Sequence, residues 1–142
     1  MELDLDALET SFDLVASRGE ELIDEFYARL FRSAPAVVPL FAGTDMQLQN
    51  AMLLGTLVLL RKSFRDLDAI VPTLRKLGAR QVAYGARPEH YAAVGAALLG
   101  AMAAIAGPAW LPTHETAWTE AYALVAATMI DGATEATLKA AA

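Results

Sequence analysis

The chain has 142 residues, a formal net charge of −6 and no cysteine. A chain of this length suits one domain that buries its core without covalent staples. The lack of cysteine excludes disulfides, thiolate-ligated metals and cysteine nucleophiles, and the acidic balance argues against nucleic acid and anionic membranes as partners.

Helical spacing of apolar residues runs through the whole chain, and strand and hairpin signals are nearly absent. A first helix is expected from about Asp6, where Asp6-Ala7-Leu8-Glu9 resembles a capping box. Gly19 separates it from a second helix over Glu20–Ser33, and a short turn or helix follows over Pro35–Phe41. The N-terminal third is therefore predicted to be helical.

Four further helices are expected after this turn: from a cap at Asp45 to about Arg65, from about Leu67 to Tyr84 with Pro72 near its start, from Pro88 to about Ala106, and from a cap at Thr113 onward. Gly85 is expected to end the second of them, and Gly132 to end or kink the last. About seven short helices with Gly and Pro corners predict one all-α domain, residues 1–142, with the crossed packing of the globin fold.

The third of these helices raises the question of a membrane span. The stretch Tyr91–Pro112 carries no charged side chain, but Gly107-Pro108 interrupts it, and Ala and Gly dominate its composition. A spanning helix needs about 20 strongly apolar residues without a break. The pattern therefore favours a core helix of a soluble domain.

Hydrolytic and phosphate-binding motifs are missing. The two histidines, His90 and His114, each stand near a helix start without a ligand-spaced partner, so a surface or capping role is favoured for both. Gln49 and Gln81 are more informative, because a buried amide needs hydrogen-bond partners. Either amide could also face solvent.

A set of short segments stands in one order along nearly the whole chain: Glu25–Phe31, Pro39-Leu40-Phe41, Val71–Leu74, Leu77–Arg80, Glu89–Tyr91 with Val94-Gly95, and Ala117-Trp118 with Ala121-Tyr122. This ordered set is similar to bacterial single-domain haemoglobins and to the globin domain of flavohaemoglobins. The resemblance implies a pocket for haem b, diatomic ligands such as O2, NO and CO, and an external reductase as electron source.

The resemblance also implies roles for single residues. Tyr27 and Gln49 match the distal pair that donates hydrogen bonds to a ligand at the iron. Leu53 resembles the apolar gate above the iron, Phe41 the ring that packs on the haem plane, and Tyr91 the tyrosine of the proximal side. Three more residues are expected to bind the cofactor. They lie on the helix expected over residues 67–84: Leu77, Arg80 and Tyr84.

Position 81 departs from the family. The iron-binding histidine is expected 32 positions after the residue matching Gln49 and ten before the one matching Tyr91, and both counts give Gln81. Haem irons in proteins take imidazole, thiolate, thioether or phenolate ligands. Gln81 is therefore predicted to be a weak or absent iron ligand. His90 cannot replace it by a register slip, because Gly85 and Pro88 lie between them.

Three hypotheses follow. The first is a cytoplasmic haem globin of the oxygen and nitric-oxide handling type, monomeric or homodimeric, with altered proximal ligation. The second is an engineered globin with peroxidase-like or carbene-transfer activity, motivated by the isolated change at position 81. The third is a haem-free globin-fold sensor or interaction module. The first two predict a red protein, and the third predicts a colourless one.

Overall fold

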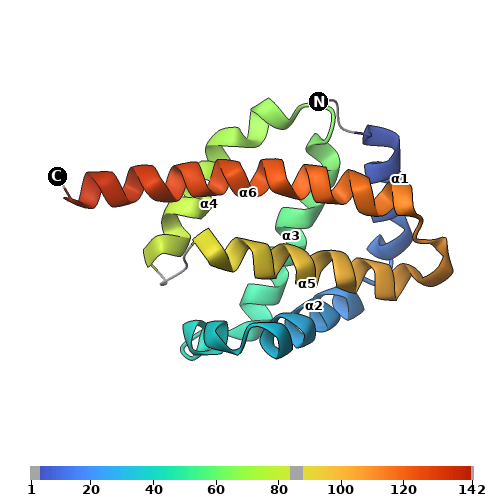
Figure 1. The fold of residues 1–142 in the computed structure, drawn as a ribbon, viewed down its shortest axis with the longest axis horizontal. Coiled ribbons are helices and arrows are strands. Elements are labelled where there is room, and N and C mark those ends of the chain that lie inside the picture. Colours follow the sequence, from blue (N-terminus) through green and yellow to red (C-terminus); the bar gives the residue numbers. More distant parts are fainter. Residues whose placement is uncertain (1–3, 84–87, 142) are drawn as a thin grey trace.

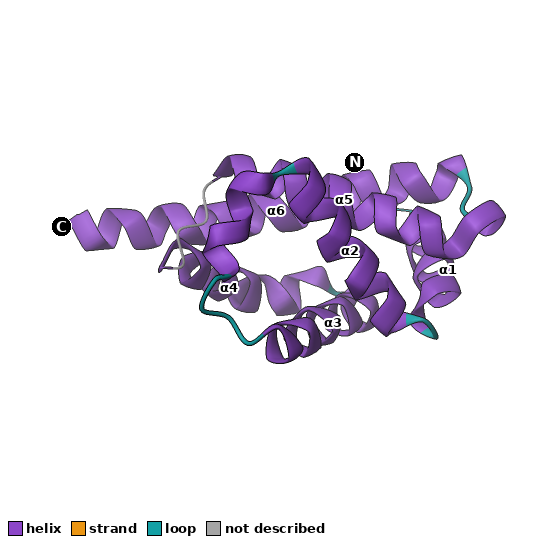
Figure 2. Cartoon of the chain, turned by 90° about the horizontal axis from the view of Figure 1, so that it is seen from below, coloured by secondary structure: helices purple, strands orange, loops and turns teal. Residues whose placement is uncertain are grey.

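The structure is a computed structural model that describes residues 4–83 and 88–141; for 81–83, 88, 89 and 136–141 it describes the backbone alone. Its elements in chain order are α1 (Leu5–Ala16), α2 (Gly19–Ser33), the 3₁₀ segment η1 (Pro35–Phe41), α3 (Met46–Ser63), η2 (Leu67–Ile70), α4 (Val71–Ala83), α5 (Pro88–Ala106), η3 (Gly107–Ala109) and α6 (Pro112–Ala141). Figure 2 shows helices and connecting loops throughout these described ranges, with no strand. The all-α prediction is confirmed.

The helix starts confirm one predicted cap and correct another. Asp45 caps α3, because its side chain accepts the N–H groups of Gln47 and Leu48 at 3.0 and 3.4 Å. The cap of α1 is Asp4, whose carboxylate accepts the Ala7 N–H at 3.0 Å, so the prediction of Asp6 is wrong. Asp6 lies inside the first turn and instead accepts a hydrogen bond from the Arg65 guanidinium at 3.0 Å.

The predicted helix over residues 67–84 is divided at its start. Leu67–Ile70 forms a 3₁₀ turn, and α4 begins at Val71 with Pro72 as its second residue. A proline is tolerated there because the first N–H groups of a helix have no partner inside it. Tyr84 and Gly85 lie outside the described residues.

The start and the course of α6 also differ from the prediction. The helix begins at Pro112, one residue before the expected Thr113 cap, and continues through Gly132 to Ala141. His114 takes the capping role, because its Nδ1 accepts the Leu111 N–H at 3.1 Å. This confirms the capping role expected for His114, although its side chain is buried.

Gly132 serves helix packing rather than termination. Figure 1 shows α6 crossing α4, and a Cβ added at Gly132 would lie 2.1 Å from the Arg75 carbonyl oxygen. A Cβ added at Gly78 of α4 would lie 1.8 Å from the Met129 carbonyl oxygen. The two glycines therefore let the backbones of α4 and α6 touch.

Helix α5 lies beside α6 and packs on α2, with α3 crossing on one side of this pair (Figure 1). Its central residues Leu98, Ala101 and Met102 are buried. In the described residues the stretch His90–Ala109 is long and apolar enough to cross a membrane by length and composition. One third of that window is buried, where α5 packs on α2 and α6, so the core role expected from the sequence is met only in part.

Candidate functional site

An apolar cavity of about 310 Å³ opens between η1, α3 and the facing ends of α4 and α5. Its walls are formed by Leu30, Val37, Leu40, Phe41, Thr44, Asp45, Leu48, Gln49, Met52, Arg80, His90, Tyr91 and Val94. Eight of these thirteen side chains are aliphatic, thioether or aromatic, and five are polar or charged: Thr44, Asp45, Gln49, Arg80 and His90. Such a cavity suits an apolar ligand that is oriented by a small number of polar groups.

The two halves of α3 differ in burial. Leu57 and Leu60 in the second half are buried in the core. Leu48 and Met52 in the first half line the cavity and are 60% and 44% exposed. These two side chains lie one turn apart and therefore share one face of the helix. The first half of α3 thus presents apolar surface to the cavity instead of to another helix.

Tyr27 lies on α2 behind the cavity wall. It is buried in an aromatic cluster, with ring centroids 5.7 Å from Phe41, 5.6 Å from Phe31 and 4.8 Å from Phe26. Burial raises the pKa of the Tyr27 phenol, and the nearby Gln49 side chain partly opposes this rise in pKa. The phenol therefore stays protonated at neutral pH.

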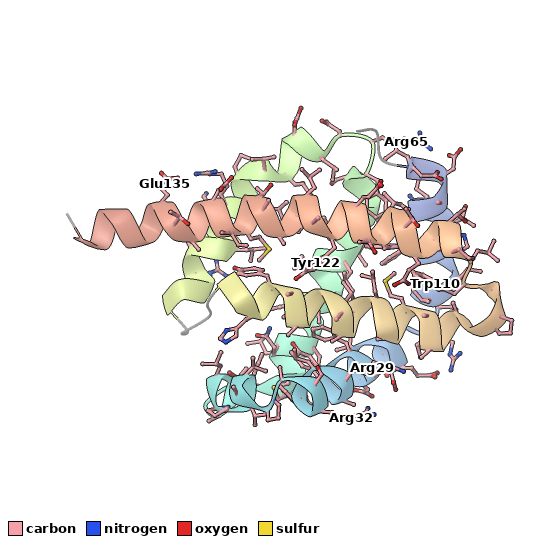
Figure 3. All side chains as sticks on the ribbon, in the orientation of Figure 1. Arg29, Arg32, Arg65, Trp110, Tyr122 and Glu135 are labelled. Atoms are coloured by element: carbon pink, nitrogen blue, oxygen red, sulfur yellow. The ribbon has the colours of Figure 1, made fainter. Side chains whose placement is uncertain are left out.

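The first turn of α5 is held against α6 by Tyr122, whose side chain lies between the two helices in Figure 3. The Tyr122 hydroxyl donates a hydrogen bond to the Tyr91 carbonyl at 2.6 Å. The ring fits there because position 95 is glycine: an added Cβ would lie 2.6 Å from the Tyr122 ring. Burial is the main cause of the raised pKa of Tyr122, and burial also raises the pKa of Tyr91.

Two basic side chains line the cavity. Arg80 at the end of α4 is exposed, as expected for a charged group at a cavity mouth. His90 in the first turn of α5 is half-buried. The cavity lining adds to the surface or capping role expected for His90, which stays a prediction.

The structure brings together four residues of the predicted site. Phe41, Gln49, Arg80 and Tyr91 line one cavity although they come from four different elements. Tyr27 is not among the side chains that form the cavity wall, and it contacts this group from behind through the Phe41 ring.

The remaining predicted site residues are placed differently. Leu53 and Leu77 are half-buried against the core and are not among the side chains that form the cavity wall. The Gln81 side chain and Tyr84 lie outside the described residues. The sequence reasoning missed Leu48 and Met52, although their spacing with Asp45 and Gln49 is the repeat of one helix face.

Within residues 4–83 and 88–141, no group of three or more His, Cys, Asp or Glu side chains is arranged to hold a bare metal ion. The cavity instead offers largely apolar walls with the Gln49 amide, the Arg80 guanidinium, the His90 imidazole and the Asp45 carboxylate, which also caps α3. Its donor set suits a large apolar molecule that carries a few polar or anionic groups.

Comparison with known proteins identifies the class. Residues 24–129 match the globin family, so the chain belongs to the globin family. It is 27% identical over 124 residues to a flavohemoprotein of Bacillus subtilis, covering 86% of this chain and 31% of that protein. The chain thus spans about a third of the length of the curated relatives that it matches first.

Solved structures agree with this assignment. A bacterial globin from Campylobacter jejuni superposes with a TM-score of 0.80 at 26% identity, covering 92% of this chain and 94% of that one. An engineered carbene transferase from Rhodothermus marinus has a TM-score of 0.87 at 20% identity, covering 97% and 96%, and shows the shared fold alone. The globin fold expected from the sequence is confirmed.

Proposed function

We propose that this globin binds haem b in the cavity and uses it to bind the small diatomic ligands O2, NO and CO. The observation that carries the proposal is the cavity itself, with hydrocarbon walls, Gln49 among them and Arg80 at one edge. Membership of the globin family and the flavohemoprotein relatives support the same cofactor.

The wall chemistry fits a haem. Its macrocycle is flat and apolar and would be covered by Phe41, Leu48, Met52 and Val94. Its carboxylates need cationic or polar partners, and Arg80 offers a guanidinium at the cavity edge. Burying several hundred Å² of macrocycle contributes about 10 kcal/mol before the cost of association. Haem retention therefore does not depend on a strong axial bond.

Haem, when bound, supplies an iron centre that coordinates diatomic ligands. The part of this chain is to orient a ligand and to exclude water. Tyr27 and Gln49 are neutral hydrogen-bonding groups, and the raised pKa of Tyr27 keeps its proton in place across physiological pH. Phe41, Leu48 and Met52 reduce access of water to the same space. A neutral donor beside an apolar wall favours a ligand that carries partial negative charge.

The proposal includes altered iron ligation at Gln81, the position where the resemblance to bacterial globins implies histidine. A neutral carboxamide there would supply little electron density to a haem iron, which would favour the ferric state. Nitric-oxide dioxygenase-like turnover would then need electrons from a reductase. We further propose that residues 1–142 form one domain, cytoplasmic, and either monomeric or homodimeric.

The test is an absorption spectrum of protein produced with ample haem, recorded in the ferric state and after dithionite reduction under CO. A strong Soret band at near-stoichiometric haem is the expected result. The Gln81→His variant is the matched control, because it restores the family's ligand type at one position. A folded, helical but colourless protein in both forms would overturn the proposal and favour a haem-free sensor or interaction module.

A further inference from the structure

The inference concerns which side chain holds the iron, and it rests on the proposed haem binding. The sequence contains two histidines, His90 and His114, and neither stands at position 81. Imidazole is a common axial ligand of haem iron in proteins, whereas a carboxamide is a poor donor. The positions of the two imidazoles therefore decide whether the chain can supply one to the cavity.

His114 does not reach the cavity. Its imidazole is buried at the start of α6, where Nδ1 accepts the Leu111 N–H at 3.1 Å. Its ring centroid lies 5.7 Å from that of Trp110. His114 is also not among the side chains that form the cavity wall. This histidine has a structural role at a helix start.

His90 lies in the cavity wall. It stands in the first turn of α5, is half-buried, and lines the same space as Gln49, Phe41 and Arg80. Its neighbours on the same helix, Tyr91 and Val94, line the cavity as well. Positions 90, 91 and 94 lie on one face of a helix, so this face of α5 is turned toward the cavity.

The backbone at His90 is also held in place. The Tyr122 hydroxyl binds the carbonyl of the next residue, Tyr91, at 2.6 Å. The absence of a side chain at Gly95 lets the Tyr122 ring pack directly on the helix. Ligands of metal sites work best when neighbouring groups fix their orientation. The first turn of α5 therefore presents its imidazole from an anchored backbone.

We propose that His90, on α5, supplies the axial imidazole of the haem iron in place of the residue at position 81. The imidazole would then belong to α5, whereas Gln81 belongs to α4, so no shift of register along α4 is needed. Two other cavity side chains can act as iron ligands, the Met52 thioether and the Tyr91 phenol. Imidazole is a stronger donor than a thioether and, unlike a phenol, coordinates without losing a proton.

The experiment compares the haem-loaded protein of the given sequence with His90→Gln and with His114→Gln as the matched control. Ferric electron paramagnetic resonance and the Soret position report the axial ligand, and haem transfer to an excess of an acceptor protein reports retention. We expect His90→Gln to shift both spectra and to speed haem loss about tenfold or more. His114→Gln should leave both spectra unchanged. The assignment would be overturned if His90→Gln had the same spectra and the same rate of haem loss as the unsubstituted protein.

A second measurement does not depend on the fold of a variant. The unsubstituted protein is produced in cells supplied with ordinary or ¹⁵N-labelled histidine. Resonance Raman spectra of the reduced form then report any iron–imidazole vibration. An isotope-sensitive iron–nitrogen band is the expected result, and a spectrum without one overturns the inference. The Gln81→His holoprotein shows how such a band looks in this cavity. If even Gln81→His binds no haem, the proposed function itself has failed.

Discussion

The α4–α6 crossing is packed very closely, whereas the first half of α3 leaves apolar side chains exposed. At the crossing, Gly78 and Gly132 bring two backbones into contact, and an added Cβ would overlap a carbonyl oxygen. Along α3, Leu48 and Met52 remain substantially exposed over a cavity of about 310 Å³. The two regions therefore differ in how completely the fold covers its own apolar surface. The open side is the surface that the proposed haem would cover.

The largest expected effect contrasts two glycine-to-alanine changes. Gly78→Ala places a methyl group against the Met129 carbonyl and is expected to lower the free energy of unfolding by about 3 kcal/mol. A Cβ added at Gly55 on α3 has no atom within 4 Å, so Gly55→Ala is expected to raise the free energy of unfolding by about 1 kcal/mol. Urea unfolding followed by circular dichroism measures both. Equal effects of the two changes would contradict the comparison.

A second contrast lies within α3 itself. Leu57→Ala removes a side chain that is 2% exposed and is expected to cost about 3 kcal/mol in the haem-free protein. Met52→Ala removes a cavity-lining side chain that is 44% exposed and should stay within about 0.5 kcal/mol. Unfolding of the haem-free forms tests this difference. In the haem-loaded forms, Met52→Ala should speed haem loss, because macrocycle contact is removed.

The polar side of the cavity is tested by Tyr27→Phe. If the Tyr27 hydroxyl donates a hydrogen bond to bound O2, as the family resemblance implies, its loss is expected to raise the dissociation rate of O2 about tenfold. Rapid mixing of the oxygenated protein with CO measures this rate. The CO dissociation rate should change less, since bound CO carries less negative charge. A similar change for both ligands would point to altered access rather than hydrogen bonding.

Tyr122→Phe tests the anchor of α5 with a smaller expected effect. The variant keeps the ring and removes the hydrogen bond to the Tyr91 carbonyl, so a loss of about 1 kcal/mol is expected. Thermal unfolding should show a midpoint lower by about 3 °C. If His90 coordinates the iron, the ferric spectrum should broaden as well, because the backbone that carries the imidazole is less constrained.

The last prediction concerns stability at alkaline pH, and it has no effect near neutral pH. Burial raises the pKa of Tyr27, Tyr91 and Tyr122, so the folded protein holds these phenol protons more tightly than the unfolded chain. Their contribution is complete below the unfolded pKa of about 10 and is lost as the pH rises through the folded values. Unfolding free energies should therefore fall above about pH 10, and less steeply in Tyr122→Phe.

Local patterns allowed several features to be predicted correctly. The Asp45 cap and the proline at the start of α5 depend on near neighbours in the chain, and the structure confirms both. The cap of α1 was predicted wrongly because Asp4 and Asp6 are both acceptable local acceptors. In the structure Asp4 caps the helix, and Asp6 instead accepts a hydrogen bond from Arg65, which is distant in sequence.

In the candidate site, too, some residues could be predicted from sequence and others depend on contacts between distant segments. Gln49 and Tyr91 were identified from ordered segments that resemble a family, and the structure places both in the cavity wall. His90 was expected to have a surface or capping role, because sequence spacing describes neighbours on one helix and not the opposite wall of a cavity. Its place in the same cavity wall as Arg80 depends on how α4 and α5 meet.

The sequence by itself determined the helical class, the positions of most helix starts and the globin resemblance, because these depend on periodicity and on short-range hydrogen bonds. Only the tertiary structure decided that Gly132 joins two helices rather than ending one, and that Leu48, Met52 and His90 face a shared space. These features arise from contacts between residues far apart in the chain. No local pattern encodes such contacts, because the same spacing can face a core, a cavity or water.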